Sequence, residues 1–205
     1  MSIQERYGSD RIIAFSDAVV AIAITVLLLP LAEVEIPEGG TLGDLIRENA
    51  TLLGGLTLSW VIIAVFWMAH HRLFDRINFF DSLTIRLNFL WMFVIALMPL
   101  PTNILIESET TSETVGFYIG WMMLTSAILV AVQWRARHTP GMMDADYVKS
   151  PEAHESQIRS LLITVVFGVC VLIAVIAPGI ALWFLLLQIP VDWIADKWAA
   201  RTYAP

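Results

Sequence analysis

Long apolar runs alternate along the chain with short stretches that carry most of its charged residues. Each run has about 20 residues, which is the length that an α-helix needs to cross the hydrocarbon core of a lipid bilayer, about 30 Å thick. The pattern predicts an all-α membrane protein with six transmembrane helices per subunit, at about 11–31, 50–71, 83–106, 114–135, 158–178 and 179–197.

Prolines and glycines mark where these helices are expected to end or bend. The helix cannot continue after Pro30, and residues 41–47 are expected to form a short amphipathic turn before the second span. Pro99 and Pro101 should kink or end the third span, because proline lacks the N–H that a helix interior needs. Pro178 leaves only a tight connection, so the last two spans should form a hairpin.

The composition agrees with a membrane protein. Hydrophobic residues make up 58% of the 205 residues and charged residues 15%, against about 45–50% and about 25% in soluble domains. The first span is not expected to be a cleaved signal peptide, because it contains Asp17 and no small-residue cleavage site follows. The lone Cys170 is expected to be buried. Residues 135–157 are too short for a catalytic domain, so residues 1–205 form one transmembrane domain and we expect no enzyme.

Arginine and lysine concentrate in segments that would lie on one side of the membrane. If both chain ends are cytoplasmic, Arg47 is the one basic residue outside, as the positive-inside rule requires. The presumed outer loops are acidic, with Glu33, Glu35, Glu38, Asp44, Glu48, Glu107, Glu109 and Glu113. These carboxylates either raise the local cation concentration or only keep short loops soluble, and the pattern leaves both explanations open.

The first span opens with three polar side chains, Arg11, Ser16 and Asp17. A charge near hydrocarbon costs about 2.5–3.5 kcal/mol even on the lenient insertion scale, so partners or a water path must compensate it. For Asp17 the sequence allows a structural hydrogen-bond or salt-bridge network on the one hand, and a proton or cation site on the other.

Three groups of residues together carry a resemblance to a known family. They are Arg11-x-x-x-Phe15-Ser16-Asp17 with Thr25, Trp67-x-x-His70-His71, and Leu87-Asn88 followed by Met98-Pro-Leu-Pro-Thr102. In this pattern the chain resembles the bacterial branch of the transmembrane protein 175 family of potassium channels, closely over its first half and only in span length and order thereafter. The resemblance implies six-span subunits that assemble as a homotetramer, with the first helix lining a central pore and no carbonyl filter loop.

Helical periodicity selects the face of the first span that would line such a pore. One stripe with the spacing i, i+3, i+4 and i+7 holds Phe15, Ala18, Ile22, Thr25, Val26 and Leu29. The resemblance implies that Ile22 forms a hydrophobic constriction, Thr25 a hydroxyl layer and Leu29 a second apolar ring, with Phe15, Ala18 and Val26 as secondary pore-lining residues. Ser16 and Asp17 lie off the stripe, and the resemblance assigns Arg11, Ser16, Asp17, His70, His71 and Asn88 to a polar network that holds the helix in place.

A ring of four Ile22 side chains can gate by dewetting, and an ion that crosses it must shed much of its hydration. Four Thr25 hydroxyls can replace part of that shell. Together with these physical arguments, the resemblance implies a potassium-selective channel with a hydrophobic gate, in the bacterial inner or plasma membrane. Its expected partners are lipid, monovalent cations and further copies of the chain, with no nucleic acid, no cofactor and no metal beyond permeating potassium.

Other interpretations of the same residues remain open. Without the resemblance, an Ile/Thr/Leu stripe is more often ordinary helix packing. Asp17 with His70 and His71 could instead serve a proton-coupled transporter or a proton pathway. Adjacent histidines diverge by about 100° on a helix and lack a third ligand nearby, which disfavours a metal site. A nucleophile with a nearby base, which an intramembrane enzyme would need, is not evident.

Overall fold

The computed structural model describes residues 3–184, with side chains from residue 10 onward. Helix α1 runs over Ile3–Leu27 and is followed by the 3₁₀ helix η1 at Leu29–Glu33. The first span was expected to remain one helix to residue 31, but the α-helix ends earlier because Pro30 has no N–H for a continuing hydrogen bond. Pro30 fits at the start of η1, where that hydrogen bond is not needed.

A short amphipathic helix, α2 at Leu42–Glu48, precedes the second span. A capping box begins it, in which Thr41 Oγ1 accepts a hydrogen bond from the Asp44 N–H and the Asp44 carboxylate accepts from the Thr41 N–H. Helix α3 follows at Ala50–Phe74. Helices are thus present where the turn at 41–47 and the second span were expected.

The third span is broken in two by its prolines, as the sequence predicts. Helix α4 covers Ser82–Ala96 and α5 covers Pro99–Glu107. Because Pro99 has no N–H, the Ile95 carbonyl accepts from the Met98 N–H instead, at 3.0 Å. The Val94 carbonyl loses its usual partner in this way and accepts from the Trp121 Nε1–H of another helix, at 2.9 Å. The break is therefore compensated by hydrogen bonds, as a bilayer requires.

The second half of the chain forms α6 at Ser112–His138, the short α7 at Ala145–Lys149, and α8 at Pro151–Ile176. Helix α8 begins seven residues before the expected 158, because Ser150 caps it by accepting from the Ala153 N–H and Pro151 suits its first position. Residues 178–184 are helical again. The rest of the expected sixth span, 185–197, lies outside the described residues.

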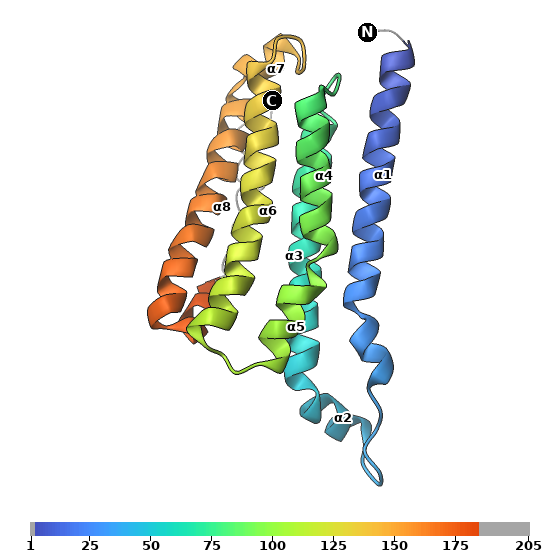
Figure 1. Ribbon diagram of the computed structural model, residues 1–205, viewed down its shortest axis with the longest axis vertical. Helices are drawn as coiled ribbons and strands as arrows, with labels where there is room; N and C mark the ends of the chain where they lie inside the picture. The colour runs from blue at the N-terminus through green and yellow to red at the C-terminus, as the bar shows by residue number, and fades with distance from the viewer. Residues whose placement is uncertain (1–2, 185–205) are drawn as a thin grey trace, which may run out of the picture.

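The long helices run alternately up and down, so the described chain is a bundle (Figure 1). Helices α1, α3 and α4 lie beside one another, and α6 pairs with α8. Five segments of the described chain are long and apolar enough to cross a membrane: Asp10–Glu33, Ala50–Phe74, Ser82–Glu107, Ser112–His138 and Pro151–Ile176. The core between them contains the fully buried Trp91, Ile95, Tyr118, Ile119 and Met122.

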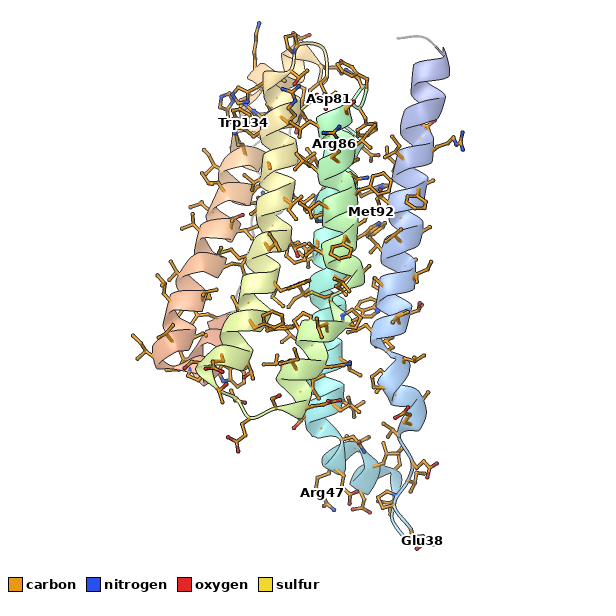
Figure 2. All side chains as sticks on the ribbon, in the orientation of Figure 1. Glu38, Arg47, Asp81, Arg86, Met92 and Trp134 are labelled. Carbon is orange, nitrogen blue, oxygen red and sulfur yellow. The ribbon has the colours of Figure 1, made fainter. Side chains whose placement is uncertain are left out.

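The two ends of the bundle differ in charge. Arg86 lies at the end where α4 begins, whereas Arg47 and the acidic Glu38 lie at the opposite end (Figure 2). The last turns of α3 and α6 also place Arg72, Arg135 and Arg137 at the Arg86 end. We call this the basic end. The alternation of the helices thus gathers the cations on one side, as a fixed membrane orientation requires.

Asp81 ties two helices together at the basic end. Its Oδ1 accepts from the Thr84 N–H at 2.8 Å and so caps α4. Its Oδ2 accepts from Nη2 and Nε of Arg135 in α6, at 2.6 and 3.0 Å. Partial burial would raise the pKa of this carboxyl, but the hydrogen bonds from Thr84 and the charge and hydrogen bond of Arg135 outweigh it and lower the pKa to about 2.

We expect Asp81→Ala to lower the free energy of unfolding by about 1–2 kcal/mol, since it removes both the helix cap and a partly exposed ion pair. Asp81→Asn should cost less, because its amide oxygen can still cap α4. Thermal unfolding in detergent measures both. Asp44→Ala in α2 is the matched control, and an equal shift there would contradict the special role of Asp81. Because the folded-state pKa is lowered, the Asp81 contribution should be complete above about pH 4 and be lost as pH falls through about 2.

Candidate functional site

The stripe selected from the sequence lies on the exposed side of α1. All six of its members are exposed in the single chain, Ile22 by 62% and Leu29 by 68%. The opposite side of the same helix is packed against α3 and α4, and it buries Val20, Ala23 and Leu27. Helix α1 therefore has one face packed against α3 and α4 and one apolar face that the described part of the chain leaves uncovered.

Thr25 is the polar member of this face. Its hydroxyl donates to the Ile22 carbonyl at 2.8 Å, so its hydrogen is used within the helix. The oxygen lone pairs remain on the exposed side and can accept or coordinate a cation. Leu29 belongs to η1 rather than to α1, so its position does not follow from the helical wheel that selected it, although it is exposed.

A directional chain of hydrogen bonds connects α3, α4 and α1 in the interior. His70 Nε2 lies 2.8 Å from Asn88 Oδ1, and since an amide oxygen only accepts, Nε2 carries the hydrogen. Asn88 Nδ2 donates to Ser16 Oγ at 2.9 Å, and Ser16 Oγ donates to the Ile12 carbonyl at 2.9 Å. The Ser16, His70 and Asn88 side chains are buried. This series of hydrogen bonds holds the packed side of α1 against α3 and α4.

The His70 ring is held on both faces as well. It stacks on Phe74 and on Trp91, with ring centroids 3.9 and 4.2 Å away. Its Nδ1 has no hydrogen-bond partner in the described structure. This packing fixes the orientation in which Nε2 reaches Asn88.

Asp17 faces α3, away from the exposed stripe. Its Oδ1 accepts a hydrogen bond from Trp67 Nε1 at 2.8 Å. His71 Nδ1 lies 3.9 Å from Asp17 Oδ2, which is an electrostatic approach but too long for a hydrogen bond. His71 also approaches Asp75, with Nε2 and Oδ2 3.5 Å apart, and stacks on Trp67. The carboxylate thus links the middle of α1 to α3.

The sequence analysis assigned one residue to this network that the structure places elsewhere and missed two others. Arg11 is exposed on α1 and is not part of the hydrogen-bonded chain. Trp67 was not assigned to the network, but it is the hydrogen-bond partner of Asp17. The spacing Trp67-x-x-His70-His71 could have indicated this, since positions i, i+3 and i+4 share a helix face. The sequence contains no comparable spacing that would have indicated Trp91, whose ring stacks on His70.

A second buried polar cluster was also missed. The hydroxyl oxygens of Ser59 and Tyr118 lie 2.8 Å apart, and Thr102 Oγ1 lies 2.9 Å from Ser59 Oγ. The cluster connects α3, α5 and α6 just beyond the proline break. Within the described residues no group of three or more His, Cys, Asp or Glu side chains could hold a metal ion.

Comparison with known proteins identifies relatives of this chain. Residues 11–99 match the model of a family described as the endosomal/lysosomal potassium channel TMEM175. A potassium channel of Streptomyces collinus is 28% identical over 157 residues, which cover 75% of this chain and 76% of that protein. A potassium channel of a Chryseobacterium strain is 26% identical over 188 residues, covering 91% and 93%. The human endosomal/lysosomal proton channel TMEM175 is 26% identical over 162 residues, which cover 78% of this chain but 31% of the human protein.

A solved structure has the same fold. The crystal structure of a lysosomal potassium-selective channel TMEM175 homologue from Chamaesiphon minutus superposes with a TM-score of 0.75, covering 97% of this chain and 100% of that one at 22% identity. The likeness in fold therefore extends over the second half of the chain, where the sequence motifs give no signal. The family and these relatives are ion channels, not enzymes.

Proposed function

We propose that the chain forms a potassium-selective channel whose pore is lined by α1, because residues 11–99 match the model of the TMEM175 family of ion channels. The bacterial relatives are named potassium channels, which supports this choice of ion. The observation that carries the proposal is the exposed apolar stripe of α1, since it faces away from the chain's own core. Four copies of the chain around a central axis would cover that stripe and enclose a path.

In this channel Ile22 forms the narrowest ring. An apolar ring of that kind excludes water when it is narrow, so an ion must shed part of its hydration to cross it. Potassium sheds water at a lower cost than sodium, and the lone pairs of Thr25 one turn further along replace part of the lost shell. Leu29 forms a second apolar ring, while Phe15, Ala18 and Val26 line the remaining path. Discrimination is expected to be weaker than in a filter built from carbonyl groups.

The network behind the pore helix holds it in place. Two sets of hydrogen bonds lie on the packed side of α1. One runs from His70 through Asn88 to Ser16, and the other joins Asp17 to Trp67. They fix the rotation of α1 about its axis, and this rotation decides which side chains face the pore. The proposal places the basic end in the cytoplasm, with both chain termini inside, six spans per subunit and the protein in the cell membrane.

Proton conduction is a second candidate, favoured by one specific observation. The animal relatives are named proton channels, and the chain has Asp17 and His71 within 3.9 Å of each other on the first two spans. A proton pathway would use these groups and His70 directly. The two proposals predict different results for Asp17→Asn, a substitution that keeps the shape of the side chain and removes its charge.

Ion flux in proteoliposomes tests the proposed function. Vesicles with an outward potassium gradient and the purified protein should release potassium down its gradient without any added second ion, at a rate well above that of empty vesicles. Valinomycin sets the maximal potassium response, and a proton ionophore removes any limit imposed by charge balance. Potassium release that requires a supplied counter-substrate, or that is no faster than in empty vesicles, would rule out the channel. Proton uptake unaffected by the potassium gradient would favour the second candidate.

A further inference from the structure

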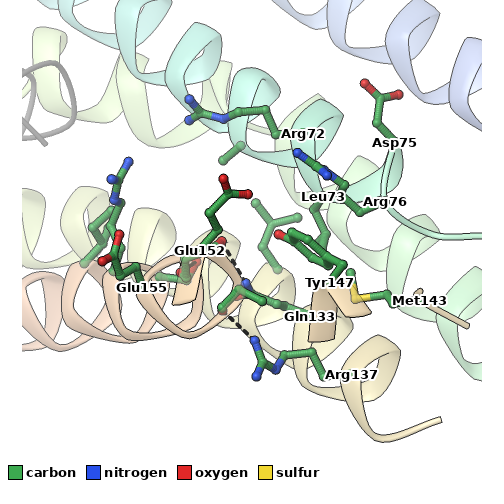
Figure 3. Close-up of a pocket in the computed structure, with 17 residues that line it drawn as sticks. Arg72, Leu73, Asp75, Arg76, Gln133, Arg137, Met143, Tyr147, Glu152 and Glu155 are labelled. Atoms are coloured by element: carbon green, nitrogen blue, oxygen red, sulfur yellow. Dashed lines mark hydrogen bonds between the residues drawn. The ribbon is translucent and has the colours of Figure 1, made fainter. Parts of the chain in front are cut away.

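A cavity of about 570 Å³ lies at the basic end, between α3, α6, α7 and α8 (Figure 3). Its volume is in the range of small-molecule binding sites. Four arginines and three carboxylates contribute to its lining. The cavity lies apart from α1 and from the proposed pore, and the channel proposal assigns it no role.

Arg76 lines the cavity. Its guanidinium carbon lies over the Tyr147 ring, 4.7 Å from the ring centroid, which holds the side chain in place. In the part of the chain that the structure describes, its N–H groups have no hydrogen-bond acceptor. A guanidinium that is held against an aromatic ring and whose N–H groups are unused is suited to bind the oxygens of a phosphate.

Glu152 supplies the opposite charge from the other wall. It belongs to the first turn of α8, and Figure 3 shows its carboxylate reaching toward the side lined by Arg72 of α3 and by Arg76, which follows the end of α3. Among the described residues Glu152 has no hydrogen bond or ion pair, whereas Asp75 already approaches His71 at 3.5 Å. A cationic and an anionic group that both lack a hydrogen-bond or ion-pair partner among the described residues therefore face one cavity.

The position of the cavity along the bundle suits a lipid headgroup. Its lining comes from the last turns of α3 and α6 and the first turns of α8, which is where the membrane-spanning segments end. Toward the membrane the lining becomes apolar, with Ala69, Leu129 and Ile163. Arg137 closes the far side, where its two terminal nitrogens donate to the carbonyls of Ala153 and Val148 and so connect α6 to α7 and α8.

We propose that this cavity binds the phosphoethanolamine headgroup of a phospholipid, with Arg76 on the phosphate and Glu152 on the ammonium group. The mixed charge of the lining is the reason for a zwitterionic ligand, since a purely anionic headgroup would leave the carboxylate facing a like charge. The ammonium of ethanolamine can donate hydrogen bonds to Glu152, but the quaternary ammonium of choline cannot. The site should therefore prefer phosphatidylethanolamine to phosphatidylcholine.

Native mass spectrometry of the delipidated full-length protein tests this preference. The protein is exposed to equimolar phosphatidylethanolamine, phosphatidylcholine and phosphatidylglycerol with the same acyl chains, and the bound amounts are compared. Glu152→Gln should lower the ratio of bound phosphatidylethanolamine to phosphatidylcholine by about tenfold, the loss of one charge-assisted hydrogen bond. Arg76→Gln should weaken the binding of all three lipids, because all three carry the phosphate group that Arg76 would bind. Glu48→Gln and Arg47→Gln, which remove the same charges from exposed positions in α2 at the opposite end, should change nothing.

Three results would overturn the assignment. Equal binding of ethanolamine and choline lipids by the unchanged protein would remove the role of Glu152. Stronger retention of phosphatidylglycerol than of phosphatidylethanolamine would mean that the site prefers a purely anionic headgroup. Competition by soluble phosphoethanolamine at the same concentration as the lipid would assign the site to a soluble ligand. Each result is a binding measurement, so failure here leaves the channel proposal to its own test.

Discussion

Ile22→Asn is expected to raise the potassium current about tenfold and to weaken the discrimination between potassium and sodium. The change keeps the side-chain length similar but replaces an apolar surface by an amide, so the ring becomes wetted and the ion keeps more of its hydration. Lowering the barrier by about 1.4 kcal/mol gives this tenfold increase. Current at fixed voltage and the reversal potential with potassium on one side and sodium on the other measure the two effects.

The control for this change must be equally exposed and equally apolar but distant from α1. Leu172 in α8 is 69% exposed and provides it, so Leu172→Asn should leave both current and reversal potential as they were. Ile22→Ala separates size from polarity, because it widens the ring and keeps it apolar. If Ile22→Asn leaves conductance and selectivity unchanged while the protein assembles normally, Ile22 is not the constriction.

The periodicity of the first span predicted its exposed face because a helix fixes the direction of each side chain relative to its neighbours. The wheel separated Ile22 and Thr25 from Ser16 and Asp17, and the structure places the two pairs on the exposed and packed sides of α1. The same reasoning fails for Leu29, where Pro30 ends the α-helix and the geometry becomes that of a 3₁₀ helix. The prolines at 99 and 101 likewise predicted a break, although the sequence does not show that Trp121 would satisfy the Val94 carbonyl.

Contacts between helices could not be predicted in the same way. Helical periodicity says which side of a helix a residue occupies but not which neighbour faces it. His70, Asn88 and Ser16 were expected in one network only because the resemblance implied it, and the order of donors and acceptors follows from the packed structure. The sequence did not predict the cavity at the basic end, since its walls come from four helices and the sequence analysis did not predict α7.

Asp17→Ala is expected to reduce the amount of assembled oligomer strongly, whereas Asp17→Asn should resemble the unchanged protein. Alanine removes the acceptor for Trp67 Nε1, and a hydrogen bond to a charged group contributes about 1.5–3 kcal/mol. Asparagine keeps an oxygen at the same position, so the indole remains bonded and α1 remains in register with α3. Size-exclusion chromatography in detergent and thermal unfolding measure the difference.

The isosteric change also decides between the two functions proposed for this chain. If Asp17 acts as a brace, Asp17→Asn retains assembly, potassium flux and selectivity, because none of these needs a proton to be bound or released. If Asp17 carries protons, the same change retains assembly but abolishes proton conduction, since an amide does not titrate. Trp67→Phe completes the comparison by removing the donor and keeping the carboxylate. Its loss of assembled oligomer should approach that of Asp17→Ala, and normal assembly of Trp67→Phe would show that the hydrogen bond is not what holds the pore helix.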